Sequence, residues 1–229
     1  MSLFVIGDTH LSLSSDKPMD IFRGWSDYVQ RLENNWNRVV GENDSVVIPG
    51  DISWAMDFRG AVKDFEFLNS LNGTKYILKG NHDYLWNTMT KMEKFFAENE
   101  FDKIKIIHNN SYSVEGFALA GTRGWFYDDS AENDKKVIMR EAGRLRLSLE
   151  EAKKLGGEIL VFLHYPPISE NQICEEIMSV IESYDVKRCY FGHLHGRISP
   201  QNAKIKYNGI DFNLVSADYL GFLPRYIPK

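Results

Sequence analysis

The sequence predicts an α/β protein in which two β-sheets pack together and helices lie outside them. Two observations lead to this expectation. Apolar, β-prone runs alternate with helix-forming stretches along most of the chain, and closely spaced strand pairs with short turns interrupt the alternation. The composition agrees, because 43% hydrophobic and 26% charged residues are typical of a globular protein. The chain has no internal repeat or flexible linker, and we expect residues 1–229 to form one domain.

The predicted strands are short runs rich in β-branched and aromatic residues. The first three are almost continuously apolar, which is typical of strands covered on both faces. The segments near 112–120 and 204–215 contain the short turns "EG" and "NG", which indicate antiparallel hairpins. In chain order the predicted strands are Leu3–Ile6, Ser45–Ile48, Tyr76–Leu78, Lys105–Ile107, Tyr112–Val114, Phe117–Ala120, Ile159–Leu163, Arg188–Phe191 and two between Lys204 and Val215.

The predicted helices fill the intervals between these strands. They are Trp25–Val40, Phe58–Leu71, Tyr84–Asn99, Asp134–Leu155 and Asn171–Ser183. The stretches "MEKFFAENE" and "SLEEAKKLGG" have helix-forming composition, and the two glycines that end the second one favour a helix stop. The tail "VSADYLGFLPRY", which contains Asp218, is interpreted as a structural terminus.

Composition and charge exclude several function classes. A net charge of −5 argues against broad binding to nucleic acid, other than as a nucleotide, or to anionic lipid. No apolar run approaches the roughly 18 residues of a membrane span, and the N-terminus does not resemble a signal peptide. The two cysteines, Cys174 and Cys189, are too few for a disulfide framework. We therefore expect a reducing, cytoplasmic setting, while the oligomeric state is not indicated.

Polar side chains with metal-binding chemistry follow five of the predicted strands. They occur in Asp8-Thr9-His10, at Asp51, in Asn81-His82-Asp83, at His164 and in His193-Leu194-His195. Of the six histidines in the chain, only His108 lies elsewhere. In open α/β sheets, ligands bind at the carboxyl ends of the strands. The sequence therefore predicts that these side chains form one site.

The donor types indicate which ions this site suits. Residues two apart in extended backbone face the same side, so Asp8 and His10 can bind one ion. His193 and His195 can bind one ion or two adjacent ones. Imidazole, carboxylate and amide donors without a thiolate suit Mn, Fe or Zn. Two ions that share a carboxylate would use all these groups, whereas one ion could not. Glycines that allow close backbone approach occur at positions 7, 50, 80, 192 and 196.

This ordered set of motifs resembles that of the calcineurin-like metallophosphoesterases. The set is Asp8-x-His10, Gly50-Asp51, Gly80-Asn81-His82-Asp83, His164 and Gly192-His193-x-His195. A lone D-x-H is common, but five motifs in order, each after a strand, are specific. The resemblance implies a four-layer αββα sandwich of two mixed sheets with a binuclear metal centre at one edge. It assigns Asp8, His10 and His195 to the first metal. It assigns Asn81, His164 and His193 to the second metal, with Asp51 bridging both.

The resemblance also implies roles around the metals. His82 would lie beside the phosphate as a catalytic acid, and Asp83 would steady or polarise it. Asp83 has an alternative interpretation as the N-cap of the helix predicted after it. Arg123, between two glycines after a strand, is a candidate phosphate ligand, and Asn81 is expected to contact the substrate as well as a metal. Aromatic candidates for the substrate pocket are Trp54, Trp86, Trp125 and Phe126.

The expected function is hydrolysis of phosphate esters with two divalent metal ions, Mn, Fe or Zn. These ions would lower the pKa of a bridging water to about 7, and the hydroxide would attack phosphorus in line. The expected partner is a small phosphorylated substrate, and monoesterase, phosphodiesterase and protein phosphatase activities stay open. Relatives that hydrolyse UDP-diacylglucosamine carry Arg where this chain has His82, which disfavours that substrate. The alternatives are a non-catalytic scaffold or a metal-binding module on the same fold.

Overall fold

A computed structural model describes residues 1–125, 131–170 and 172–229, with the side chains of residues 131–134 left out. Phe126 and Asn171, which the sequence assigned to a pocket and to a helix start, lie outside the described residues. The described strands form a five-stranded and a six-stranded sheet. Both sheets are mixed, because a parallel core in each is flanked by antiparallel edge strands.

The five-stranded sheet holds the N-terminal strands. In spatial order it consists of β11 (Arg225–Ile227), β1 (Leu3–Val5), β2 (Ser45–Pro49), β3 (Thr74–Leu78) and β4 (Ile104–Ile106). Strands β1 to β4 are parallel, and β11 runs antiparallel to β1. Every residue of β1 and β2 is buried, as the continuous apolar runs predicted.

The six-stranded sheet follows in the chain. It consists of β5 (Tyr112–Val114), β6 (Phe117–Thr122), β7 (Glu158–Leu163), β8 (Val186–Phe191), β10 (Ile210–Leu214) and β9 (Lys204–Tyr207). The four middle strands of this order are parallel. The edge strands β5 and β9 pair antiparallel with β6 and β10, so both predicted hairpins are confirmed.

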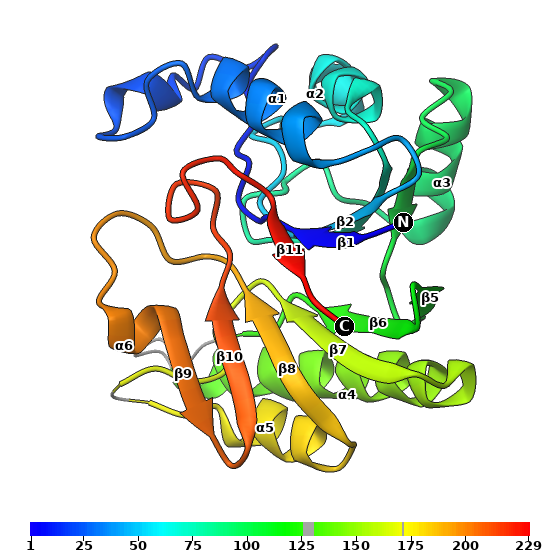
Figure 1. Cartoon of the computed structure of the whole chain (residues 1–229), viewed down its shortest axis with the longest axis vertical. Coiled ribbons are helices and arrows are strands. Elements are labelled where there is room, and N and C mark those ends of the chain that lie inside the picture. Colours follow the sequence, from blue (N-terminus) through cyan, green and yellow to red (C-terminus); the bar gives the residue numbers. More distant parts are fainter. Residues whose placement is uncertain (126–130, 171) are drawn as a thin grey trace.

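The helices lie outside the two sheets (Figure 1). One layer contains α1 (Tyr28–Val39), α2 (Phe58–Ser70) and α3 (Met89–Glu98), and the opposite layer contains α4 (Ala131–Leu155) and α5 (Glu175–Glu182). Two short helices, η1 (Met19–Ile21) and α6 (Pro200–Ala203), lie in loops. The four-layer αββα arrangement expected from the sequence is confirmed.

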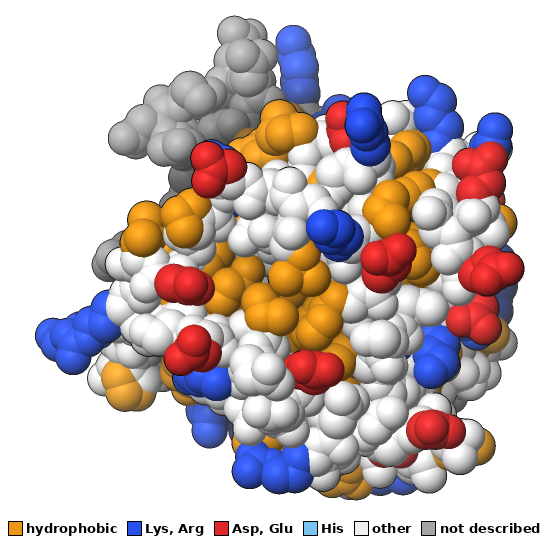
Figure 2. Space-filling model, turned by 90° about the horizontal axis from the view of Figure 1, so that it is seen from above, with side chains coloured by type: hydrophobic (Ala, Val, Ile, Leu, Met, Phe, Trp, Pro, Cys, Tyr) orange, Lys and Arg blue, Asp and Glu red, His pale blue; other side chains and the backbone are white. Residues whose placement is uncertain are grey.

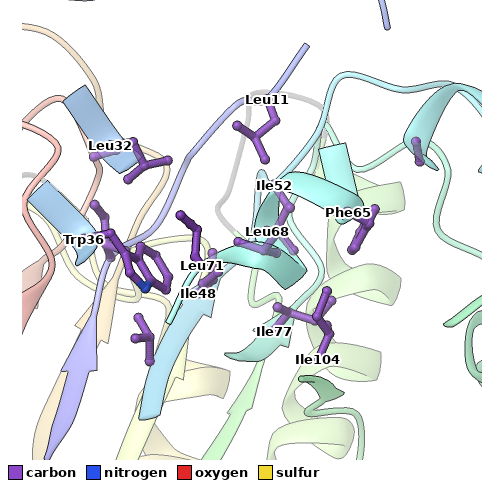
Figure 3. Close-up of a cluster of buried hydrophobic side chains, with 14 of the residues drawn as sticks. Leu11, Leu32, Trp36, Ile48, Ile52, Phe65, Leu68, Leu71, Ile77 and Ile104 are labelled. Carbon is purple, nitrogen blue, oxygen red and sulfur yellow. The ribbon is translucent and has the colours of Figure 1, made fainter. Parts of the chain in front are cut away.

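Three apolar clusters fill the spaces between these layers. The cluster between α1–α3 and the five-stranded sheet appears in Figure 3, where side chains from the helices and the strands point toward one another. Residues labelled there include Leu32, Trp36, Phe65, Leu68, Ile48, Ile77 and Ile104. A second cluster lies between α4, α5 and the six-stranded sheet. The third holds the two sheets face to face, with Val47 from one sheet and Phe162 from the other. Removing this apolar surface from water is the main force that joins the layers.

Several elements differ from the sequence-based prediction, among them one strand and the starts of two helices. Strand β11 was not predicted, because a three-residue run shows no periodicity and its partner β1 lies at the other end of the chain. Helix α1 begins at Tyr28 and not at Trp25, because Asp27 has left-handed backbone with φ of 52°. Helix α3 begins at Met89 and not at Tyr84, because Thr88 before it is extended.

The distribution of surface charge and the state of the two cysteines agree with what the composition led us to expect. Figure 2 views the molecule from above and shows acidic and basic side chains interspersed over that face, with hydrophobic side chains gathered near its middle. Cys174 and Cys189 are both buried and form no disulfide. Among the described helices, none is both long enough and apolar enough to cross a membrane. The assignment of residues 1–229 to one domain stays a prediction.

Candidate metal centre

The seven predicted metal ligands follow strands of both sheets and meet at one edge. From the five-stranded sheet come Asp8, Asp51 and Asn81, which follow β1, β2 and β3. From the six-stranded sheet come His164 after β7 and His193 and His195 after β8. His10 belongs to the loop after β1, whose backbone is tied to the neighbouring loop by the bond from His10 N to Asp51 O at 3.0 Å. The carboxyl ends of parallel strands thus collect side chains that are far apart in sequence.

Asp8, His10 and His195 form the first ligand group, in which the ligand atoms all lie within 4.8 Å of one another. The Nε2 atoms of His10 and His195 are 3.1 Å apart, and His195 Nε2 is 3.6 Å from Asp8 Oδ1. Nitrogen ligands that each lie about 2.0–2.1 Å from one ion have a separation of this order. The group therefore fits a single cation.

Asp51, His164 and His193 form the second ligand group, with the same mutual spacing of at most 4.8 Å. Asn81 belongs beside it, because its Oδ1 lies 2.6 Å from His164 Nε2 and 3.0 Å from His193 Nδ1. Asp51 Oδ2 lies 3.4 Å from His164 Nε2 and 3.7 Å from His10 Nε2. One carboxylate oxygen is therefore within reach of both groups.

Four of the seven candidate ligands have left-handed backbone, a conformation that side chains other than glycine seldom adopt. The φ angles are 56° at Asp8, 44° at His10, 51° at Asp51 and 70° at His193. Such residues cost of the order of 1–3 kcal/mol each and persist where the surrounding structure holds them. Their collection at one edge indicates that the backbone is arranged for the side chains it presents.

Two glycines are required because the ligand carboxylates pack directly on them. A Cβ atom at Gly80 would collide with the carboxylate of Asp51, and one at Gly192 would collide with that of Asp8. Both contacts are with side chains that are themselves buried and fixed by hydrogen bonds from His82 N and His193 N. The close approach that the sequence pattern predicted at these two glycines is therefore present.

The free chain lacks the positive charge that would keep all of these carboxylates ionised. Burial raises the pKa of Asp51 to about 9, and the nearby carboxylates of Asp8 and Asp83 add to this rise. Burial would raise the pKa of Asp8 too, but the hydrogen bond from His195 and the charges of His164 and His195 hold it below its usual range. The buried Oδ2 of Asp8 has no hydrogen-bond partner. Divalent cations would supply the missing positive charge.

The histidines of the two groups differ in protonation. Burial lowers the pKa of His10 and of His164 to about 3, so both rings are neutral at pH 7 and have a lone pair for a metal. Burial would likewise lower the pKa of His195, but hydrogen bonds with Asp218 and Asp8 raise it to about 10. Metal binding at the first ligand group would therefore displace a proton from His195.

Asp218 is a residue of the site that the sequence analysis missed. Its Oδ1 lies 3.0 Å from His195 Nδ1, and its Oδ2 accepts a hydrogen bond from Gly196 N at 2.9 Å. This contact orients the imidazole so that Nε2 faces the other ligands. Asp218 follows β10, a parallel strand, just as the predicted ligands follow theirs. An acidic residue shortly after a sixth apolar run was the signal, and the interpretation of the tail as a terminus overlooked it.

His82 lies beside the first ligand group without joining it. Its ring centroid is 5.8 Å from that of His10 and 4.4 Å from that of Trp54. Its Nδ1 is 3.0 Å from the hydroxyl of Tyr84. Burial and the charge of His195 lower its pKa. This placement agrees with a group that acts next to the metals, and the role of His82 stays a prediction.

Asp83 has different partners from those expected. Its buried carboxylate accepts four backbone hydrogen bonds, at 2.7–3.2 Å, from Gly80, Asp51, Ile52 and Ser53. The expected bond from Asp83 to His82 is not among those of the described residues, and Asp83 does not cap a helix, since α3 begins at Met89. Burial raises its pKa to about 6, while the four amide donors oppose that rise. Asp83 therefore ties the loop after β2 to the loop after β3.

Arg123 turns its side chain into a neighbouring cavity of about 500 Å³. Its carbonyl accepts a hydrogen bond from His164 N at 3.1 Å, so its backbone adjoins a candidate ligand. Its guanidinium carbon lies 4.7 Å from the Trp125 ring centroid, and its Nη2 lies 3.6 Å from Glu141 Oε1. The expected contact of Arg123 with phosphate stays a prediction. Of the aromatic pocket candidates, Trp86 lines this same cavity.

Comparisons with known proteins agree with this geometry. A family model described as calcineurin-like phosphoesterase matches residues 1–197.

Similar solved structures include a protein of unknown function from Aquifex aeolicus, with 14% identity, a TM-score of 0.54 and coverage of 98% of this chain and 95% of that chain. A phosphopantetheinyl hydrolase from Mycobacterium tuberculosis has 13% identity, a TM-score of 0.58 and coverage of 99% and 95%. A Thermus thermophilus protein has 12% identity, a TM-score of 0.58 and coverage of 98% and 97%. At these identities the likeness shows the fold alone. No curated protein matches the chain.

The contact of Asp218 with His195 leads to a test of metal affinity. Asp218→Ala should lower the affinity of the first ligand group for Mn²⁺ by about 10–100-fold, because the imidazole loses the carboxylate that orients it. Titration calorimetry on metal-stripped protein measures this change. Asp211→Ala, on the exposed side of β10, is the matched control and should bind Mn²⁺ like the unaltered protein. Equal affinities for the two variants would contradict the positioning role.

The partners of Asp83 lead to a second test. Asp83→Asn replaces one acceptor oxygen by an NH₂ group that faces backbone N–H donors, and should lower the free energy of unfolding by about 1–3 kcal/mol. Loss of metal should accompany this change, because Asp83 holds the loop that carries Asp51. Urea unfolding and elemental analysis measure both effects, with the exposed Asp102→Asn as control. A variant with unchanged stability and metal content but slow turnover would restore the expected role of Asp83 in polarising His82.

Proposed function

Because the chain belongs to the calcineurin-like phosphoesterase family, we propose that it hydrolyses phosphate esters with the help of two divalent cations. One observation carries this proposal. Asp51 Oδ2 lies 3.4 Å from a nitrogen of the second ligand group and 3.7 Å from a nitrogen of the first. A carboxylate shared in this way is what a binuclear centre requires, because it lowers the repulsion between two cations.

The residues present fit two such ions. Each ligand group combines imidazole nitrogens with a carboxylate, and the buried Oδ2 of Asp8 has no hydrogen-bond partner within the protein. Mn, Fe and Zn suit these donors, and both cysteines are elsewhere. When bound, the ions would attract the anionic ester and lower the pKa of a bridging water to about 7, which makes hydroxide available as the nucleophile.

The chain's own residues would position and protonate the reactants. Asp83 holds the loop that carries Asp51, and Asp218 holds the ring of His195. Asn81 would contact the substrate as well as the second ion. His82, just outside the ligand groups, would donate a proton to the departing oxygen. Burial lowers its pKa in the free protein, and a phosphate dianion bound beside it would raise the pKa again and favour the acid form.

The proposed substrate is a small phosphorylated molecule, and both monoesters and diesters suit the ligand set. The Mycobacterium tuberculosis structure is named a phosphopantetheinyl hydrolase, but its 13% identity supports a common fold and not a common substrate. Two buried cysteines without a disulfide are compatible with the cytoplasmic, reducing setting expected from the sequence.

The experiment that tests this function separates it from the scaffold and the metal-binding module. Metal-stripped protein is reconstituted with Mn²⁺, Fe²⁺, Zn²⁺ or Mg²⁺, analysed for metal content, and assayed on a panel of phosphomonoesters and phosphodiesters. We expect two ions per chain and turnover that depends on them, with both lost in Asp51→Asn. Two bound ions without turnover on any ester would favour the metal-binding module. At most one bound ion would contradict the binuclear centre.

The position of His82 leads to a test with two leaving groups. His82→Ala should keep both ions but lose about 10²–10⁴-fold in turnover on alkyl phosphates, whose poor leaving groups need the proton. The loss should be much smaller for nitrophenyl phosphate, because nitrophenolate departs without one. Kinetics on both substrates and metal analysis of the same preparation measure this. A variant that loses metal would make His82 a ligand, and equal losses on both substrates would point to contact with the phosphate oxygens.

A further inference from the structure

An apolar cavity of about 360 Å³ opens beside the first ligand group. Its lining includes His10 and His195 of the first ligand group, together with His82 and Asp218. The rest of its wall is mainly the side chains of Met19, Phe22, Trp25 and Trp54. A cavity of this size falls within the range of small-molecule sites, and its lining includes residues where chemistry is expected.

The apolar part of the cavity wall offers a ligand few free polar atoms. The indole N–H of Trp54 donates to the sulfur of Met19 at 3.2 Å, so the one polar atom of that side chain is occupied within the protein. Trp25 is 3% exposed and packs edge-on against Tyr28 and Phe222, which makes it a rigid floor. A ligand that enters the cavity therefore meets ring faces and a thioether, with Arg23 and Asp218 among the polar side chains of the described lining.

Packing of the core accounts for part of this wall but not for all of it. Met19 and Trp25 are buried, as core residues are. Phe22, in contrast, is 54% exposed although it is a large apolar side chain at the edge of a cavity. This leaves part of the phenyl ring in water next to the cavity, where a ligand can cover it. An exposed ring at the mouth of an apolar cavity is typical of a surface that a ligand covers.

The place of His82 connects this cavity with the reaction. Its ring centroid is 4.4 Å from that of Trp54, on the cavity side, and 5.8 Å from that of His10, on the ligand side. If the phosphorus of an ester lies at the two ligand groups and its departing oxygen faces His82, the alcohol portion extends into the apolar cavity. The cavity therefore contacts the group that leaves.

We propose that this cavity binds the alcohol portion of the substrate and selects an alcohol that carries an aromatic ring system. The proposal rests on the proposed function, because it takes the departing oxygen to face His82. A ring system is favoured over an alkyl chain because the walls are themselves rings, and aromatic pairs gain from stacked or edge-to-face contact beyond the area they bury. Phe22 is a specificity residue in this proposal, since it closes the outer end over the bound ring.

The experiment measures binding of phosphonates, whose C–P bond is not hydrolysed. Titration calorimetry on the Mn²⁺-loaded protein compares ethylphosphonate with 2-(2-naphthyl)ethylphosphonate, which share the phosphonate and the first two carbons. The naphthyl compound should bind on the order of 10–100-fold more tightly, from the apolar area it buries. In Phe22→Ala this ratio should fall at least about fivefold. Ile21→Ala is the matched control, because Ile21 directly precedes Phe22, is 74% exposed and does not line the cavity.

Each other outcome overturns a stated part of the proposal. An unaltered ratio in Phe22→Ala, or an equal fall in Ile21→Ala, would remove Phe22 from the site. Octylphosphonate binding as tightly as the naphthyl compound would overturn the assignment to a ring. Hydrolysis of simple esters with no preference for the naphthyl group would overturn this inference and leave the proposed function standing. A naphthyl preference without hydrolysis of any ester would overturn the proposed function and show that the cavity binds rings without acting on them.

Discussion

The carboxylate of Asp83 is the interaction on which the rest of the site depends. Four backbone amides from two loops donate to it, and the groups it joins are fully buried. Through this contact the loop after β2 is held against the loop after β3, which sets the left-handed backbone of Asp51 and the close packing of its carboxylate on Gly80. An ionised carboxylate with several amide donors is among the stronger hydrogen-bonded arrangements in proteins. It can therefore hold strained backbone that would otherwise relax.

The site combines buried carboxylates with the two neutral imidazoles of His10 and His164, and this combination explains why it suits cations. The carboxylates of Asp8, Asp51 and Asp83 lie close enough to raise the pKa of Asp51, while burial keeps His10 and His164 uncharged. The folded chain thus concentrates lone pairs at one edge, and the protonated ring of His195 balances only part of the carboxylate charge that would form there. Positive ions would relieve this imbalance, and the same ions would make the edge attractive to a phosphate although the whole chain is acidic.

Two cavities of different chemistry flank the ligand groups. The one beside the first group is walled by aromatic rings, and the one reached by Arg123 is lined by several basic side chains around Glu141. The metal ligands come from strand ends that are rigid because both faces of their sheets are buried. The cavity walls come largely from loops and helices, such as η1 and α4, which can vary without disturbing the ligands. The strand ends therefore determine the type of reaction, whereas the loops and helices around the cavities determine which substrate binds.

The sequence by itself determined the fold class, the two hairpins and the side chains that would gather at the strand ends. It could do so because each candidate ligand directly follows an apolar run, which is a local pattern that a reader can recognise. Only the tertiary structure decided the partners of Asp83 and Asp218, the pairing of β11 with β1 and the aromatic cavity beside His82. These depend on contacts between residues 22 to over 200 positions apart, or on which face of a loop turns inward. Such contacts form when the layers pack together, and the hydrophobic periodicity of the sequence does not indicate them.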